Sequence, residues 1–234
     1  MELSAHGLCK AFGGKPILAD VSLTVNSRET LAIVGRSGCG KTTLLRLLAS
    51  LLPPDGGHIT VDGVTVTVPS KDRLLVFQGL EQLFPWQTLL SNVCFAIRKA
   101  LPHLTAAEVN ERAMHSLKRM GLAAAAQQYP YQLSGGMKQR GALARALAIA
   151  PRVLLMDEPF SSLDEFTRGH VREAFETLKE DTGAAVVLVT HDVAEAVQCA
   201  ARIAVLSART KGFLAVLEND GATVKAALRS LLAD

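Results

Sequence analysis

Two hydrophobic patterns alternate along the chain, and together they predict strands separated by helices. Fully apolar runs of five or six residues, typical of strands buried on both faces, occur at 30–34, 153–157 and 185–190. Helical spacing of apolar residues follows these runs, at 44–51, 165–180 and 193–200. Since strands that alternate with helices form a parallel sheet covered on both faces, the chain is predicted to be an α/β protein.

Two regions depart from this alternation. Residues 17–25 and 58–63 read as half-buried strands bounded by turns, ahead of and behind the first strand–helix pair. Residues 88–128 show helical patterns without an intervening strand, and Thr105 with Glu108 forms a capping box at a helix start. We therefore expect a helical insert in an otherwise alternating chain, and one further strand and a short helix after residue 212.

The amino-acid composition limits the class of protein but does not identify its function. The chain has 234 residues, 49% hydrophobic and 20% charged, which suits one globular domain with a sizeable core. The net charge of +3 is small and forms no basic cluster, so no nucleic-acid partner is expected. The four cysteines are far apart and are expected to be free thiols in a reducing compartment. We see no export signal and no bilayer-spanning run, so a role at a membrane would require docking to a protein already there.

A glycine-rich loop between the strand at 30–34 and the helix after it has the phosphate-binding pattern G-x-x-x-x-G-K-T. Its residues are Gly35, Arg36, Ser37, Gly38, Cys39, Gly40, Lys41, Thr42 and Thr43. Glycines let the backbone turn its N–H groups toward a phosphate, and the helix N-terminus adds partial positive charge. Lys41 can reach the β- and γ-phosphates, and the Thr42 hydroxyl can bind Mg²⁺. The loop therefore predicts an ATP-type ligand.

Polar residues follow three other strands, where ligands bind in open α/β sheets. Asp157 can hold Mg²⁺ opposite Thr42, and Glu158 can polarise the water that attacks the γ-phosphate. The Gln78 amide can approach the metal or this water, and His191 can hydrogen-bond the γ-phosphate. Gln78 and His191 could equally be ordinary solvated side chains. Asp157 and Glu158 are better supported, because a P-loop requires an acidic residue at such a strand end.

A second anion site is predicted at Ser134, Gly135 and Gly136, where a serine suited to N-capping precedes another helix. Because the P-loop of one subunit already holds the triphosphate, a second anion site would be redundant within that subunit. We therefore expect this site to contact the nucleotide bound by a second copy. Two subunits related by a two-fold axis would then bury two ATP molecules. Phe12, at a turn between strands, is either a core side chain or a stacking surface for adenine.

Taken together, and in the order in which they occur along the chain, these motifs resemble those of the ATP-binding subunit of ABC transporters. The loop at 35–43 matches Walker A, 133–140 matches the LSGGQ-type signature with Met137 at the usual glutamine position, and 153–159 matches Walker B. Gln78 matches the Q-loop, His191 the switch histidine and Phe12 the aromatic A-loop, which favours adenine stacking. Ser162 and Asp164 lie in a segment that looks like the D-loop. The segments at 76–78, 83–88, 92–93 and 154–160 are similar to the nitrate/sulfonate/taurine group of bacterial importers.

The resemblance implies a P-loop NTPase fold over residues 1–234: a RecA-like parallel core, an antiparallel β subdomain and a helical subdomain near 79–150. It implies Mg²⁺-dependent ATP hydrolysis by a homodimer at the cytoplasmic face of the inner membrane. A permease would dock near Gly79–Trp86, where an ordinary surface loop is the alternative, and a solute-binding protein would act indirectly. Ala201 and the tail at 207–234 depart from the family's pattern, which leaves the C-terminal contacts open.

Other functions remain possible on these residues. An exporter cassette has the same motifs, and a non-transport ABC ATPase would carry coiled-coil inserts or tandem cassettes, which this chain lacks. A P-loop kinase of small molecules would need a pocket for the phosphate acceptor, and it would not require the signature motif at 133–140. The transported solute would be selected by the permease and the binding protein, so the cassette sequence does not name it.

Overall fold

The computed structural model describes residues 1–79, 82–161 and 163–233 and divides the chain into two compact units. Unit 1 comprises Met1–Leu75, Arg152–Glu158 and Gly183–Asp234, and unit 2 comprises Val76–Pro151 and Pro159–Thr182.

Unit 1 contains two sheets. A four-stranded antiparallel sheet has the order β2-β1-β4-β5, and a six-stranded sheet has the order β10-β9-β3-β8-β7-β6. The strands of the first sheet are β1 (Glu2–Phe12), β2 (Lys15–Asn26), β4 (Gly56–Val61) and β5 (Val64–Thr65). Those of the second are β3 (Thr30–Val34), β6 (Arg73–Val76), β7 (Val153–Asp157), β8 (Ala185–Thr190), β9 (Arg202–Leu206) and β10 (Phe213–Glu218). The helices of this unit are α1 (Lys41–Leu48), α6 (Val193–Cys199) and α7 (Ala222–Ala233).

The central strand β3 shows why the apolar runs form a buried parallel sheet. It pairs in parallel with β8 and with β9, and β8 pairs in parallel with β7. Leu31 and Ile33 pack with α1 and the antiparallel sheet, whereas Ala32 and Val34 pack with α6 and α7. A strand covered on both faces needs apolar residues at every position, which is the pattern of the sequence. β10 adds an antiparallel edge next to β9.

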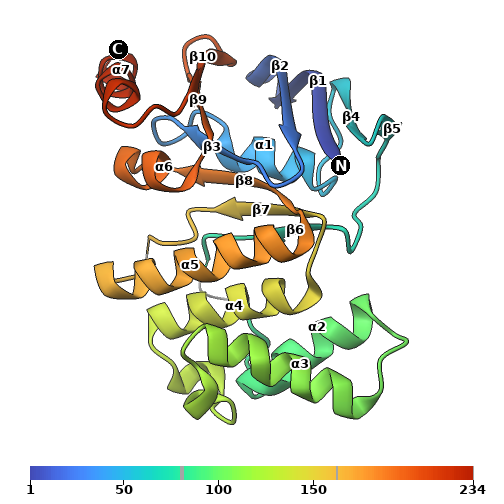
Figure 1. Ribbon diagram of the computed structural model, residues 1–234. Coiled ribbons are helices and arrows are strands. Elements are labelled where there is room, and N and C mark those ends of the chain that lie inside the picture. The colour runs from blue at the N-terminus through green and yellow to red at the C-terminus, as the bar shows by residue number, and fades with distance from the viewer. Residues whose placement is uncertain (80–81, 162, 234) are drawn as a thin grey trace. The chain divides into compact units, whose positions relative to one another are not determined.

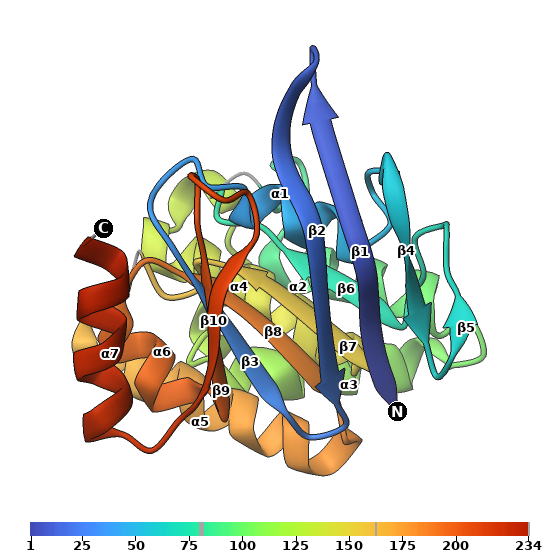
Figure 2. The same cartoon turned by 90° about the horizontal axis from the view of Figure 1, so that it is seen from above.

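Figure 2 shows the long hairpin formed by β1 and β2 of the antiparallel sheet. Its turn projects beyond the ends of the other strands of unit 1. The turn contains Gly13 and Gly14, both at positive φ, as a tight connection requires. Phe12 lies at this end of the hairpin and is 50% exposed, so it does not cap the core.

Unit 2 is helical, and α2, α3 and α4 pack against one another (Figure 1). Its α-helices are α2 (Leu89–Ala100), α3 (Ala106–Arg119), α4 (Gly135–Ile149) and α5 (Glu165–Thr182), with short 3-10 turns at Ala123–Ala125 and Pro130–Gln132. Local chemistry sets the helix starts: Thr88 caps α2, Thr105 and Glu108 form the expected capping box of α3, and Ser134 caps α4.

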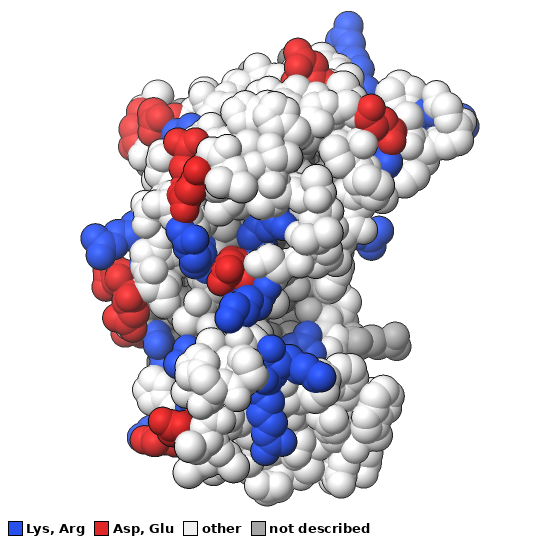
Figure 3. Space-filling model, turned by 90° about the vertical axis from the view of Figure 1, so that its right-hand side faces the viewer, with Lys and Arg blue, Asp and Glu red and all other residues white. Residues whose placement is uncertain are grey.

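The surface has mixed charge. Figure 3 shows one face, on which Lys and Arg side chains and Asp and Glu side chains both occur among a majority of uncharged residues. Among the described residues, no helix combines the length and the apolar character needed to cross a bilayer.

Candidate nucleotide site

The glycine-rich loop connects β3 to α1, as expected, and two of its glycines, Gly35 and Gly40, lie where a side chain would be in close contact with other atoms. A Cβ atom at Gly35 would lie 2.4 Å from the Leu206 carbonyl oxygen and 2.7 Å from the Cys39 sulfur. Gly40, the residue before α1, has φ of 106°, in the left-handed region. Burial raises the pKa of the Cys39 thiol, which favours a packing role over a nucleophilic one.

Lys41 is held inside the loop. Its side chain is buried, and Nζ donates hydrogen bonds to the carbonyl oxygens of Gly35 at 2.8 Å and Arg36 at 3.2 Å. These two bonds use two of the three donors of the ammonium group. The positive charge therefore lies where the loop backbone and the N-terminus of α1 also favour an anion.

Thr42 and Asp157 bring two oxygen donors together. The Thr42 hydroxyl donates a 2.7 Å hydrogen bond to Asp157 Oδ2, across the carboxyl end of the sheet. Burial raises the pKa of Asp157, and the bond from Thr42 opposes this rise. A buried carboxylate beside a hydroxyl is a donor set that fits Mg²⁺, which prefers oxygen ligands and would offset the cost of burying the charge.

No group of three or more His, Cys, Asp or Glu side chains that could hold a metal ion occurs in the part of the chain described. A site with one carboxylate and one hydroxyl is still adequate for Mg²⁺, because this ion keeps several waters and binds substrate phosphates.

Glu158 and His191 form a second pair in unit 1. His191 Nδ1 lies 3.0 Å from Glu158 Oε1. The two residues follow β7 and β8, which are parallel neighbours, so their approach results from strand order. Glu158 has φ of 47°, unusual for a residue with a side chain, and its N–H donates to the Val189 carbonyl oxygen at 2.9 Å. A strained residue held by the sheet is typical of a functional site.

Two other predicted site residues, Phe12 and Gln78, belong to different units. Phe12 is in unit 1, at the hairpin turn, with Lys10 Nζ 5.8 Å from its ring centroid. Gln78, which is exposed, belongs to unit 2. The structure thus brings together the P-loop, Asp157, Glu158 and His191 within unit 1.

The turn at Ser134–Gly136 also belongs to unit 2. The Ser134 hydroxyl accepts a hydrogen bond from the Met137 N–H at 3.3 Å, which makes it the N-cap of α4. Asp164 accepts two hydrogen bonds from Thr167, one from its N–H and one from its hydroxyl. Ser162, predicted with Asp164 in the D-loop, lies outside the described residues.

Two polar residues in unit 2 are buried, a role that sequence reasoning did not assign to them although both lie in matched segments. Asn92 is fully buried and makes four hydrogen bonds, to the backbone of Phe84, Gln87 and Thr88. Gln139 is also fully buried, and its Nε2 donates to the Pro159 carbonyl oxygen. A signal for Asn92 existed: it shares the inward face of α2 with apolar residues, where a polar side chain needs a partner.

The C-terminal tail contacts the P-loop, which the sequence left open. Arg36 Nε donates a 3.2 Å hydrogen bond to the carbonyl oxygen of Leu232, near the end of α7. Leu231 and Leu232 pack on the same apolar cluster as Val34 of β3. A guanidinium at the C-terminal end of a helix satisfies a terminal carbonyl and complements the helix dipole.

We expect Arg36→Ala to weaken ATP binding about three- to tenfold, because one charge-assisted hydrogen bond that orders the loop is lost. It should also increase hydrogen exchange of the amides of α7. ATP titration and exchange mass spectrometry measure the two effects. Arg209→Ala is the matched control, since Arg209 is an exposed arginine near the same helix. Unchanged exchange in α7 would contradict the coupling.

The sheet, the glycine loop and the lysine within it define the class: a P-loop nucleotide-binding ATPase. Comparison with known proteins is more specific. The family model described as "ABC transporter" matches residues 18–161. The chain belongs to the ABC transporter family, and it is an ATP-hydrolysing cassette of that family.

Similar proteins include a Yersinia pestis "Taurine import ATP-binding protein TauB", 45% identical over 205 residues, which are 88% of this chain and 79% of the relative. A Synechococcus elongatus "Nitrate import ATP-binding protein NrtC" is 43% identical over 196 residues, and the match covers 83% of this chain and 30% of that protein. Both relatives support the resemblance to the nitrate/sulfonate/taurine group.

Among solved structures, the dimeric "MJ0796, a Bacterial ABC Transporter Cassette" superimposes with a TM-score of 0.85 at 30% identity. The match covers 94% of this chain and 99% of that one. A second structure of the same protein is a post-hydrolysis state with ADP and Pi, with a TM-score of 0.84. The predicted fold, a P-loop NTPase with an antiparallel sheet and helices, is confirmed.

Proposed function

We propose that this cassette energises the import of a small anion, of the sulfonate or nitrate kind, through a separate membrane permease. The names of its relatives support this proposal, since they are ATP-binding proteins of taurine and nitrate import. In this proposal the chain sits at the cytoplasmic face of the inner membrane, and a solute-binding protein supplies the anion on the other side.

For hydrolysis we propose the following roles. Lys41 and the P-loop N–H groups bind the β- and γ-phosphates, and Phe12 stacks on adenine. Thr42 and Asp157, with Gln78, would hold Mg²⁺, which supplies charge neutralisation at the phosphates when bound. Glu158 accepts a proton from the attacking water, and His191, within hydrogen-bond distance of Glu158, orients this carboxylate and the γ-phosphate. The Thr42–Asp157 and Glu158–His191 pairs at neighbouring strand ends are the observation on which this assignment rests.

We propose further that each ATP is shared between two copies. Ser134, Gly135 and Gly136 of one copy would contact the phosphates held by the P-loop of the other. The dimeric form of MJ0796 supports this arrangement. The exposed N-terminus of α4 supplies N–H groups suited to an anion.

The permease is proposed to dock on the loop at Gly79–Trp86, of which residues 80–81 lie outside the described part. Trp86 is 71% exposed, and its ring lies 5.4 Å from that of Phe84, which contacts Phe95 at 5.2 Å. The buried Asn92 fixes the backbone beneath these rings. Rigidly held, exposed aromatic side chains are typical of binding hot spots.

Transport is tested by purifying the tagged chain from membranes with its permease and reconstituting the complex in liposomes. We expect ATP hydrolysis to rise when a solute-binding protein loaded with taurine or nitrate is added. Trp86→Ala should weaken permease binding by about 2 kcal/mol, roughly thirtyfold, while the ATPase of the free subunit is unchanged. Tyr131→Ala, at an aromatic residue 73% exposed, is the matched control. Full coupling in the Trp86 variant would contradict the docking site.

A further inference from the structure

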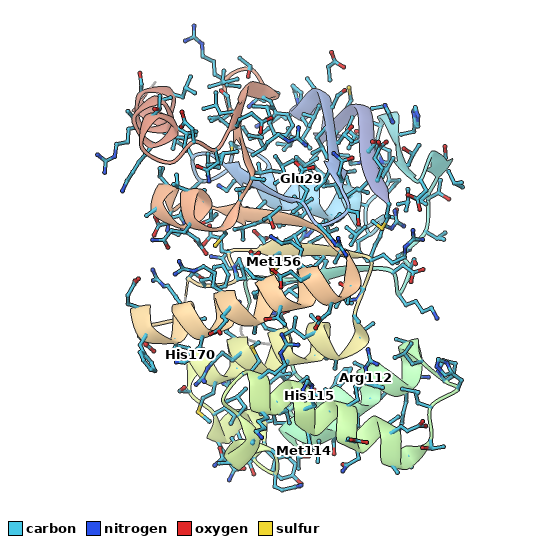
Figure 4. All side chains as sticks on the ribbon, in the orientation of Figure 1. Glu29, Arg112, Met114, His115, Met156 and His170 are labelled. Atoms are coloured by element: carbon cyan, nitrogen blue, oxygen red, sulfur yellow. The ribbon has the colours of Figure 1, made fainter. Side chains whose placement is uncertain are left out.

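A basic cavity in unit 2 contains none of the residues assigned to ATP. Its volume is about 290 Å³, and it lies between the end of α3, the second turn of α4 and the first turns of α5. Lys118, Arg119 and Arg140 contribute cationic side chains, and His170 and Phe166 contribute rings whose centroids are 4.6 Å apart. Figure 4 shows His170 on α5. The cavity is large enough for a small molecule with several oxygen atoms.

The charges that line this cavity have one sign. In the described part of the chain, no carboxylate is among the lining residues. The acidic groups at the start of α5 already have partners: Asp164 accepts two hydrogen bonds from Thr167, and Glu165 pairs with Arg168 at 3.9 Å. Asp164 also interacts electrostatically with Arg140 and offsets part of its charge. The described lining itself holds three cations and no carboxylate, so an anion between them would offset the remaining repulsion.

Backbone contacts hold the two guanidinium groups in place. Arg119 Nη2 donates to the Ala174 carbonyl oxygen at 3.0 Å, and Arg140 Nη1 donates to the Met120 carbonyl oxygen at 2.9 Å. Each bond uses one of the five N–H donors of its arginine. The remaining donors belong to side chains whose orientation is already fixed, which lowers the entropy lost on binding a ligand.

Arg140 also has a donor that the described residues do not satisfy. Its Nε is buried and has no hydrogen-bond partner among the described residues. Gly121 leaves room beside this guanidinium, because a Cβ there would lie 3.2 Å from Arg140 Nη1, at φ of 67°.

We propose that this cavity binds a small oxyanion, namely a phosphate, sulfate or sulfonate group. Planar guanidinium groups match such oxygens with parallel charge-assisted hydrogen bonds, and Lys118 adds a flexible third cation. The apolar rim at Phe166 and His170 can accommodate a short organic substituent on the anion. The proposal does not depend on which solute is transported, and it can fail while the import function stands.

Equilibrium dialysis of the full chain tests the site at constant ionic strength, with the P-loop filled by saturating ADP and Mg²⁺. The probes are radiolabelled sulfate, inorganic phosphate and taurine. We expect saturable binding of at least one probe, weakened about tenfold or more by the exposed substitution Lys118→Glu. The control is Lys225→Glu, which makes the same charge change at an exposed lysine of α7 and should leave the affinity within about twofold.

The pattern across probes identifies the source of the anion. Preference for taurine assigns the cavity to a sulfonate with an organic substituent, and equal binding of sulfate and phosphate assigns it to free inorganic ions. Absence of saturable binding with ADP present would overturn the proposal. Equal weakening by Lys118→Glu and Lys225→Glu would also overturn it, because net charge alone would then explain the binding.

Discussion

Glu158→Gln should reduce the maximal rate of ATP hydrolysis by roughly 10²- to 10⁴-fold while leaving ATP binding intact, which is the loss expected when a general base is removed. The amide has the shape of the carboxylate but cannot accept a proton from water. Since Glu158 does not belong to the phosphate loop, the nucleotide should still bind, and the closed dimer should accumulate. Phosphate release and size-exclusion chromatography with ATP measure the two effects.

The control for this substitution is Glu165→Gln, at a glutamate whose side chain is 83% exposed. It removes the same charge and should change the rate by less than about twofold. Hydrolysis at the native rate by the Glu158 variant would refute the role given to this residue. His191→Ala adds a second test, because loss of the 3.0 Å contact should slow hydrolysis even though the carboxylate remains.

Local sequence chemistry predicted much of this site because its parts are adjacent in the chain. The strand, the glycine loop and α1 follow one another directly, and the N-caps at Thr88, Thr105 and Ser134 each depend on residues within one turn. These features need no knowledge of the tertiary structure, and the loop and the caps at Thr105 and Ser134 were found where expected, whereas the cap at Thr88 was not predicted.

Other features depend on contacts between distant segments, which single-sequence patterns do not contain. Glu158 meets His191 only because β8 lies beside β7, and Arg36 meets Leu232 only because α7 packs near β3. The basic cavity depends in the same way on the packing of α3, α4 and α5. Hydrophobic periodicity indicates which face of each helix is buried, but it does not identify the neighbour.

The second large effect concerns the sharing of ATP between two copies. Lys41→Ala removes the ammonium group from the phosphate loop, and Ser134→Arg places a bulky cation at the N-terminus of α4. Each variant alone should lose hydrolysis by roughly 10²-fold or more, because groups that stabilise the transferring phosphate are lost. An equal mixture of the two variants distinguishes a shared site from a site within one chain.

If the site is shared, each mixed dimer has one site with both defects and one with neither. Random assembly makes roughly half of the dimers mixed, so single-turnover hydrolysis should return to about a quarter of the native amount. If Ser134 instead serves the P-loop of its own chain, every site in the mixture has a defect and no activity returns. Recovery in the mixture also shows that both variants fold, since an unfolded chain could not supply its intact half. If circular dichroism shows that both variants are folded, a mixture as inactive as its components would remove the proposal that two copies share each nucleotide.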